Sequence, residues 1–208
     1  MVNHFSGKFI TFEGIDGCGK STQIELLAQT LTSKGILVLK TKEPGGTQLG
    51  VVLRKMLLDD PMVLNSYAEL LLFLADRIEH IHKVIVPALQ KGIWVLSDRY
   101  WDSTLAYQGY GRKLDLKWIQ DLANSEPLCL KPDLTFLMDI SVEESIKRRL
   151  SKKADKMETE SKKFLEDVRS GFLQLAQKEK ERILLVDGSK DIEMIQSEIE
   201  EKSFILTS

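Results

Sequence analysis

The sequence predicts an α/β fold with a parallel sheet of five strands, and three observations support this fold class. Short, almost continuously apolar runs recur along the chain, as expected for strands that are covered on both faces of a sheet. Segments with apolar residues at three- and four-residue spacing separate these runs, as in amphipathic helices. Strands that alternate with helices imply right-handed crossovers, which produce a parallel sheet flanked by helices.

The expected strands and helices are spread over the whole chain. The five strand-like runs are Phe9–Glu13, Ile36–Thr41, Ile93–Ser97, Leu134–Met138 and Ile183–Val186. Two apolar stripes at helical spacing are formed by Ile24, Leu27, Ala28 and Leu31, and by Tyr67, Leu70, Leu71, Leu74 and Ile78. The chain has 208 residues, enough for one substantial core, and shows no repeat or low-complexity linker, so we expect residues 1–208 to form a single domain.

The composition excludes several classes of protein. The longest apolar run, Leu70–Ala75, is far shorter than the roughly 20 residues that cross a bilayer. The formal net charge is -2, so no global field attracts nucleic acid, and any phosphate recognition must be local. The two cysteines, Cys18 and Cys129, are too few for a disulfide scaffold. The first eight residues lack the features of an export signal, so we expect a cytoplasmic protein.

A phosphate-binding loop directly follows the first predicted strand. It satisfies the pattern G-x-x-x-x-G-K-[ST] and precedes a predicted helix, as this loop requires. Its glycines let backbone N–H groups face phosphate oxygens, and the helix N-terminus adds partial positive charge. Lys20 can reach the β- and γ-phosphates of ATP, and Ser21 can offer its hydroxyl to Mg²⁺. The residues expected to bind ATP are Gly14, Ile15, Asp16, Gly17, Cys18, Gly19, Lys20, Ser21 and Thr22.

Such a loop fits a GTPase, an ATP-driven motor or a small-molecule kinase. A Ras-like GTPase also needs Asp-x-x-Gly after a later strand and Asn-Lys-x-Asp, and the chain has neither outside the loop. Asp98-Arg99-Tyr100 follows the third predicted strand instead. Because ligands bind at the carboxyl ends of strands in open α/β sheets, we expect Asp98 and Arg99 beside the loop. Asp98 could hold Mg²⁺ there, and Arg99 could clamp a phosphate.

Three further motifs complete a family pattern. They are Glu43-Pro44-Gly45-Gly46-Thr47, the segment Leu70–Arg77 and the segment Asp98–Gly109. Together with the loop, and in this order and spacing, they closely resemble the thymidylate kinase family from Phe9 to about Asp187. The resemblance implies a P-loop NTPase-type five-stranded parallel sheet with a helical lid, and transfer of the ATP γ-phosphoryl group to dTMP. It also implies a homodimer.

The resemblance assigns the recognition of thymine and deoxyribose to four residues. Phe73 would stack on the thymine ring, and Arg77 would donate to a thymine carbonyl. Thr104 would bond the base edge, and Tyr107 would pack under the deoxyribose and oppose a 2′-hydroxyl. From the residues alone, Phe73 would fit an ordinary core position, but a buried arginine one helical turn later needs a polar partner.

Five further residues are expected around the sugar and phosphate of dTMP. By the resemblance, Asp16 accepts from the 3′-hydroxyl, and Arg54 and Arg99 neutralise the acceptor phosphate. Glu43 would anchor the Pro-Gly-Gly turn near the site, and Gln108 would complete the dTMP pocket. Ser21 and Asp98 are the expected Mg²⁺ ligands.

The charged segment Ser145–Lys163 corresponds to the lid of this family, at about residues 148–160. Bacterial members usually place arginines there, but this chain has lysines at the matching positions. A lysine supplies charge without the guanidinium fork. We therefore expect the catalytic cation of the lid to be Arg149, Lys153 or Lys156, and the sequence does not decide among them. A solvated helix-loop-helix also fits this composition, and a nucleic-acid patch fits less well because aromatic residues are absent.

The expected chemistry needs no general base, because a phosphate oxygen of dTMP is already ionised at neutral pH. Lys20, Asp98 and Arg99, with a lid cation, would position the phosphates and neutralise charge. Two alternatives remain open at this stage. One is another nucleoside monophosphate or deoxynucleoside kinase, and the other is a non-catalytic ATP-dependent switch.

Overall fold

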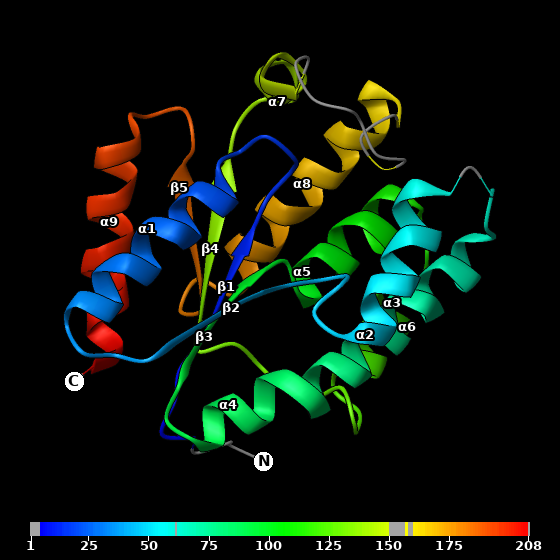
Figure 1. Ribbon diagram of the computed structural model, residues 1–208. Helices are drawn as coiled ribbons and strands as arrows, with labels where there is room; N and C mark the ends of the chain where they lie inside the picture. Colours follow the sequence, from blue (N-terminus) through cyan, green and yellow to red (C-terminus); the bar gives the residue numbers. More distant parts are fainter. Residues whose placement is uncertain (1–4, 61, 150–156, 158–159, 208) are drawn as a thin grey trace.

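Five parallel strands form a sheet in the order β2-β3-β1-β4-β5 (Figure 1). The computed structural model describes residues 5–60, 62–149, 157 and 160–207. The strands are β1 Phe9–Glu13, β2 Val38–Lys42, β3 Trp94–Asp98, β4 Leu134–Asp139 and β5 Ile183–Asp187. The predicted fold class and all five predicted strands are thereby confirmed. In β1, at the centre, all five residues are buried, whereas residues of the edge strand β2 are partly exposed.

The bounds of β1 are those predicted, and the other four strands differ from the prediction by one or two residues at an end. The largest difference is at β2, which begins at Val38 instead of Ile36. The backbone N–H of Ile36 donates to the carbonyl of Leu31, so Ile36 closes the end of the preceding helix and does not pair with β3. The apolar run therefore contains a helix-terminating turn as well as a strand.

Helices cover both faces of the sheet. Figure 1 shows α1 and α9 on one face, and α3, α5, α6 and α8 on the other. The α-helices are α1 Lys20–Ser33, α2 Gln48–Arg54, α3 Ser66–His80, α4 Val86–Gln90, α5 Trp101–Thr104, α6 Leu116–Ala123, α7 Val142–Arg149, α8 Lys162–Lys178 and α9 Ile192–Phe204. Wider π-helical turns continue three of them, at η1 Lys55–Asp59, η2 Ile81–Ile85 and η3 Leu105–Gly111, and a 3₁₀ turn, η4 Ile205–Thr207, follows α9.

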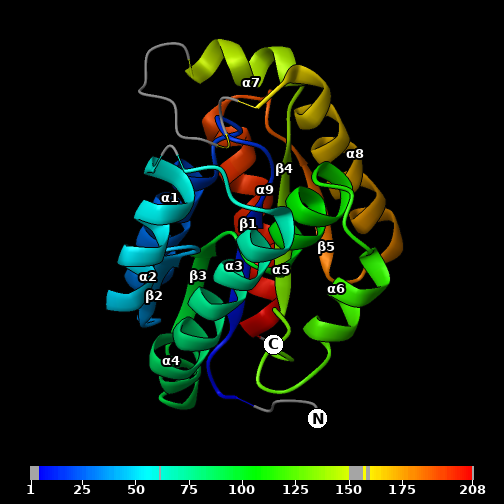
Figure 2. The ribbon, with the colours of Figure 1, turned by 90° about the vertical axis from the view of Figure 1, so that its right-hand side faces the viewer.

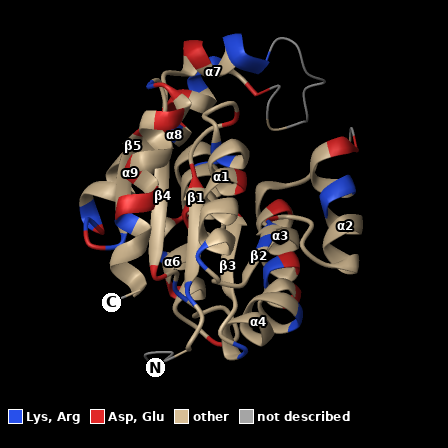
Figure 3. Ribbon diagram, turned by 60° about the vertical axis from the view of Figure 1, so that its left-hand side comes forward, with Lys and Arg blue, Asp and Glu red and all other residues tan. Residues whose placement is uncertain are grey.

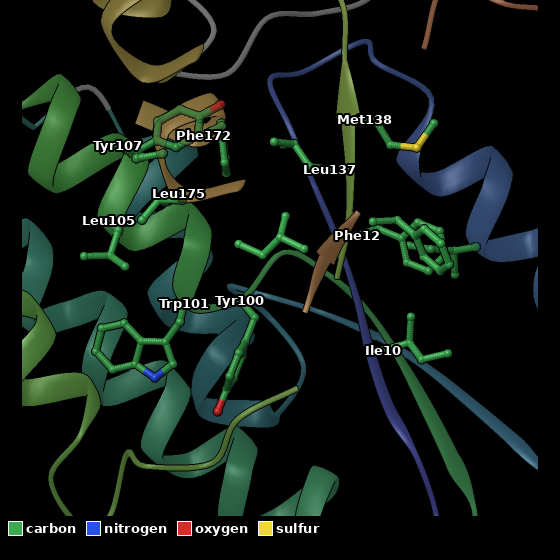
Figure 4. Packing of buried hydrophobic residues seen from close by; sticks show 14 of the residues in the cluster. Ile10, Phe12, Tyr100, Trp101, Leu105, Tyr107, Leu137, Met138, Phe172 and Leu175 are labelled. Carbon is green, nitrogen blue, oxygen red and sulfur yellow. The ribbon is translucent and has the colours of Figure 1, made fainter. Parts of the chain in front are cut away.

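The apolar core lies on both faces of the sheet. Figure 4 shows Phe12 and Met138 on one side of the strands, and Leu137, Tyr100 and Phe172 on the other. Tyr100 and Trp101 are buried but keep their polar groups paired, because the Tyr100 hydroxyl and the Trp101 indole N–H donate to backbone carbonyls. Charged residues lie mainly on the helices and at strand ends, away from the middle of β1, β3 and β4 (Figure 3).

The parallel register fixes the position of the functional edge. Phe12 pairs with Asp98 across β1 and β3, so the two strands end side by side. The phosphate-binding loop leaves β1 and the Asp98-Arg99 turn leaves β3 at this edge, at the top of Figure 2. Among the described residues, no helix is long and apolar enough to cross a membrane.

The contact between α8 and η3 is close enough to require glycine at position 171. A Cβ at Gly171 would lie 2.6 Å from ring atoms of Tyr110. Alanine usually stabilises a helix interior relative to glycine, but here its methyl group would clash with the Tyr110 ring. Gly171→Ala should therefore lower the free energy of unfolding by about 1–3 kcal/mol. The measurement is denaturant unfolding, with Ser170→Ala on the exposed side of α8 as the matched control. Equal stability of the two variants would contradict close packing here.

Candidate active site

The phosphate-binding loop joins β1 to α1 through three glycines with positive φ, Gly14, Gly17 and Gly19. At Gly14, with φ of 129°, a Cβ would lie 2.3 Å from the carbonyl oxygen of Met138, so only glycine fits. The Lys20 ammonium donates to the carbonyls of Gly14 and Ile15, at 3.1 and 3.3 Å. The loop therefore holds a buried cation at the N-terminus of α1, as phosphate binding requires.

Cys18 contributes no evident chemistry to this loop. Its side chain is buried, and its sulfur lies 3.7 Å from the Lys20 ammonium. Burial raises the pKa of the Cys18 thiol. The side chain therefore packs under the loop.

Ser21 and Asp98 meet where α1 begins and β3 ends. The Ser21 hydroxyl donates to Oδ2 of Asp98 at 2.8 Å, on the exposed rim of the loop. A hydroxyl and a carboxylate are hard oxygen ligands of the kind that Mg²⁺ accepts. In the part of the chain that the structure describes, no group of three or more His, Cys, Asp and Glu residues could hold a metal unaided. The pair therefore suits a Mg²⁺ ion that takes its remaining ligands from substrate phosphates and water.

Arg99 lies between the loop and the helices beyond β3. Its guanidinium donates to Oδ1 of Asp16 at 2.7 Å and to the Gly14 carbonyl at 3.0 Å. It also donates to the hydroxyls of Ser103 and Tyr107, at 3.0 and 3.3 Å. Burial raises the pKa of the Asp16 carboxyl, but the charges of Arg99 and Lys20 outweigh it and hold that pKa well below its usual value. Asp16 is therefore ionised at neutral pH.

A second arginine, Arg77 on α3, is fully buried and bound by Glu43. Its Nε donates to Oε2 of Glu43 at 2.7 Å, and its Nη1 donates to the Thr104 hydroxyl at 2.9 Å. The other oxygen of Glu43 pairs with Nδ1 of His80 at 2.8 Å, and the opposite ring nitrogen of His80 lies 2.6 Å from the Thr41 hydroxyl. Burial raises the pKa of Glu43, but Arg77 and His80 lower it below its ordinary value. The polar partner expected for Arg77 is therefore present.

The Pro-Gly-Gly turn is held by Asp76 and Arg54. Oδ1 of Asp76 accepts from the backbone N–H of Gly45 at 3.1 Å, and Nη1 of Arg54 donates to the carbonyl of Pro44 at 2.9 Å. From the sequence, Glu43 is expected to anchor this turn near the site. Its carboxylate binds Arg77 and His80, so it holds the residue that precedes Pro44 against α3, while Asp76 and Arg54 bond the turn itself.

All nine residues expected at the acceptor site line one pocket. They are Asp16, Glu43, Arg54, Phe73, Arg77, Arg99, Thr104, Tyr107 and Gln108. A second pocket is lined by the loop from Asp16 to Thr22 together with Asp98 and Arg149. Four residues line both pockets: Asp16, Glu43, Arg54 and Arg99. Gly14 and Ile15 line neither pocket. They form the start of the loop, and their carbonyls accept from Lys20.

Helix α7 is bound to the loop from above. The Ser145 hydroxyl donates to the carbonyl of Asp16 at 2.6 Å, and Nη1 of Arg148 donates to the carbonyl of Gly188 at 3.0 Å. Arg149 donates to the carbonyl of Ser145 at 3.2 Å, and its side chain passes over Gly17. The other two expected lid cations, Lys153 and Lys156, lie outside the described residues.

Sequence reasoning missed four residues around the site. Ser145 and Arg148 hold α7, His80 pairs with Glu43, and Glu13 contacts the turn after β3. Two of them carried a signal in the sequence. Glu13 is a lone carboxylate at the end of an apolar strand, and His80 follows Arg77 by one helical turn.

Comparisons with known proteins agree with this geometry. A family profile described as thymidylate kinase matches residues 12–199. A thymidylate kinase from Prochlorococcus marinus (strain NATL1A) is 48% identical over 202 residues, which cover 93% of this chain and 96% of the relative. A thymidylate kinase from Carboxydothermus hydrogenoformans is 47% identical over 194 residues, covering 93% and 95%. The crystal structure of a thymidylate kinase from Ehrlichia chaffeensis superimposes with a TM-score of 0.77 at 36% identity, covering 97% of this chain and 99% of that one.

The buried Asp76 should make stability depend on pH. Burial and the charge of Glu43 raise its pKa to about 6, from an ordinary value of 3.8, and its Oδ2 has no hydrogen-bond partner among the described residues. A raised carboxyl pKa stabilises the fold below pH 4, and this contribution is lost as pH rises through 6. Asp76→Asn cannot ionise, so its free energy of unfolding should rise relative to that of the wild type between pH 4 and pH 7, by up to roughly 3 kcal/mol. Denaturant unfolding across this range measures the difference, and a flat difference would contradict the assignment.

Proposed function

This chain belongs to the thymidylate kinase family, and we propose that its two adjoining pockets hold ATP and dTMP end to end. The enzyme transfers the γ-phosphoryl group of ATP to dTMP and yields ADP and dTDP. The observation that carries this arrangement is the position of Asp16 and Arg99 in both pockets. A phosphate that enters from either side meets these two side chains at the junction.

The donor phosphates are assigned to the loop and to Lys20. The backbone N–H groups at the start of α1 suit the oxygens of a polyphosphate, and the ammonium lies among the carbonyls of the loop. Lys20 would leave these weak carbonyl contacts for a phosphate of higher charge. Ser21 and Asp98 would hold Mg²⁺, which would neutralise part of the phosphate charge when it is bound.

The acceptor is assigned to the pocket between α3 and the α5–η3 segment. Phe73 offers a ring for the thymine to stack on, and Arg77 lines the same pocket, held by Glu43. Stacking of the Arg77 guanidinium on Trp101, at 4.4 Å from the ring centroid, further fixes its orientation. The Tyr107 ring forms the floor for the deoxyribose, and Arg54 and Arg99 face the phosphate.

The reaction then requires positioning and charge neutralisation. An oxygen of the dTMP phosphate attacks the γ-phosphorus in line, and the bond from that phosphorus to the bridging oxygen of ADP breaks. Arg99, at the junction, neutralises the charge that both phosphates bring. Among the residues that the structure describes, Arg149 on α7 is the candidate for the cation of the lid. Lys153 and Lys156 remain the alternatives.

Two further assignments complete the proposal. Exposed apolar side chains gather on α2, α3 and α6, on the side that faces the viewer in Figure 2, and Tyr67 contacts Trp118 there. A second copy of the chain would cover this face in a homodimer. We place the enzyme in the cytoplasm, where its two free cysteines would stay reduced. A coupled ADP-release assay with dTMP, dUMP, dCMP, dGMP and AMP tests the assignment of the acceptor.

The assignment of thymine recognition predicts a selective effect of Arg77. Arg77→Ala should raise the KM for dTMP by about 10- to 100-fold, because a charge-assisted hydrogen bond to the base is lost. The KM for ATP should stay within about 2-fold, since Arg77 lines only the acceptor pocket. Arg77→Lys is the matched variant, because it keeps a charge beside Glu43 but not the fork. Steady-state kinetics for both substrates make the measurement, and a rise confined to the KM for ATP would reverse the two pockets.

The role of Lys20 predicts an effect on turnover. Lys20→Met should lower kcat by at least ~10²-fold, as the loss of one preorganised electrostatic group does in other enzymes. The variant should remain folded, because methionine has a similar length and the ammonium is held only by loop carbonyls and nearby side chains. Turnover at saturating ATP and dTMP is the measurement, with circular dichroism to check folding. Turnover near that of the wild type would refute the assignment of the donor site.

A further inference from the structure

Arg99 has a backbone conformation that only a few residues other than glycine adopt. Its φ is 75°, in the left-handed region, and the other described residue of this kind is Lys113. Such a conformation persists when the surroundings fix it, and it often does so at functional sites. The groups that fix Arg99 therefore determine where its guanidinium points.

Three hydrogen bonds hold this turn. The N–H of Arg99 donates to the carbonyl of Phe12 at 3.0 Å, and the Ser97 hydroxyl donates to the carbonyl of Arg99 at 2.8 Å. The next N–H, that of Tyr100, donates to Oε1 of Glu13 at 2.7 Å. Two of these acceptors are backbone carbonyls, and the third is a carboxylate from the neighbouring strand.

The same carboxylate also reaches the side chain of Arg99 through one serine. Oε2 of Glu13 accepts from the Ser103 hydroxyl at 2.5 Å, and the Ser103 oxygen accepts from Nη1 of Arg99 at 3.0 Å. The direction of this chain is fixed, because arginine can only donate. Ser103 must accept from Arg99, so its single proton is directed to Glu13.

We propose that Glu13 is a positioning residue for acceptor-phosphate binding, which fixes both the backbone and the guanidinium of Arg99. Glu13 lines neither pocket and has no exposed surface, so it acts through Arg99 and does not touch a substrate. The inference rests on the proposed role of Arg99 as a ligand of the dTMP phosphate.

The surroundings of Glu13 argue against a purely structural role. Burial and the nearby charge of Asp102 on α5 raise the pKa of Glu13 to about 7, so the ionised form is costly to bury. Arg182 pairs with Asp102 at 2.8 Å, and the charge of Arg99 lowers the pKa of Glu13 without outweighing burial. A neutral glutamine of the same shape would be easier to bury and could still accept from Tyr100. The fold alone therefore does not require the charge.

Glu13→Gln separates the two roles. When the amide oxygen accepts from the Tyr100 N–H, the NH2 group faces Ser103 and cannot accept its proton, so the chain to Arg99 is broken while the packing volume is kept. The KM for dTMP should rise by about 10-fold, the loss expected for one hydrogen bond in a charged network, and kcat should fall as well, because Arg99 also neutralises charge in the reaction. The KM for ATP should stay within about 2-fold, because the loop and Lys20 hold its phosphates. Its melting temperature at pH 8 should equal or exceed that of the wild type. Ser103→Ala, which removes the middle of the chain, should give a similar rise in the KM for dTMP.

A double-mutant cycle tests whether Glu13 acts through Arg99. Arg99→Ala alone should raise the KM for dTMP, and adding Glu13→Gln to it should raise this KM no further. Asp133→Asn is the matched control, because this carboxylate accepts from the Phe9 N–H at the opposite end of β1, and this variant should leave both KM values unchanged.

Three other results would overturn the proposal or the role of Arg99 on which it rests. Additive effects in the cycle, or equal rises in both KM values with a lower melting temperature, would overturn the proposal, because Glu13 would then serve the fold. An unchanged KM for dTMP in Glu13→Gln, with a raised one in Arg99→Ala, would overturn it and leave the role of Arg99 intact. No effect of Arg99→Ala on dTMP would overturn the proposed role of Arg99 itself.

Discussion

The parallel pairing of β1 with β3 is the constraint on which the rest of the site depends. The pairing ends with Phe12 opposite Asp98, so a glycine-rich loop and an acidic-basic turn leave the sheet at the same level. Ser21 can then reach Asp98, and Arg99 can reach the loop carbonyl of Gly14. A shift of the register by one residue would turn these side chains to the other face of the sheet. The pairing of the two strands therefore fixes the positions of the loop and the turn that we propose to bind the phosphates.

Buried charges form the second layer of organisation. Arg77 and Glu43 are both almost fully inaccessible, and each is held by partners from other elements, among α3, α5 and the segment after β2. Buried ion pairs of this kind contribute little net stability, because desolvation offsets their attraction. Their benefit is orientation, since a guanidinium held on two sides has little freedom. The pocket that we propose for the acceptor is thus preorganised by groups that lie behind its wall.

Local motifs could be predicted from the sequence, and long-range partners could not. The loop, the strand ends and the nine acceptor residues follow from short patterns and from a family resemblance carried by four motifs. The roles of Glu13, His80 and Asp76 were not predicted. Each depends on a partner about 30 to 90 residues away in the sequence, which no local pattern indicates. The partners of Glu43 could not be predicted for the same reason, since Arg77 and His80 lie 34 and 37 residues further along the chain.

The attachment of α7 to the loop links the two halves of the site mechanically. The Ser145 hydroxyl holds the carbonyl of Asp16, and the carboxylate of the same residue holds Arg99. A displacement of α7 that follows occupation of the donor side would pass through one residue to the acceptor side. Linkage then requires the reverse effect of equal size, so a bound monophosphate would change the affinity for the triphosphate by the same factor. The binding of each substrate would then affect the binding of the other through Asp16.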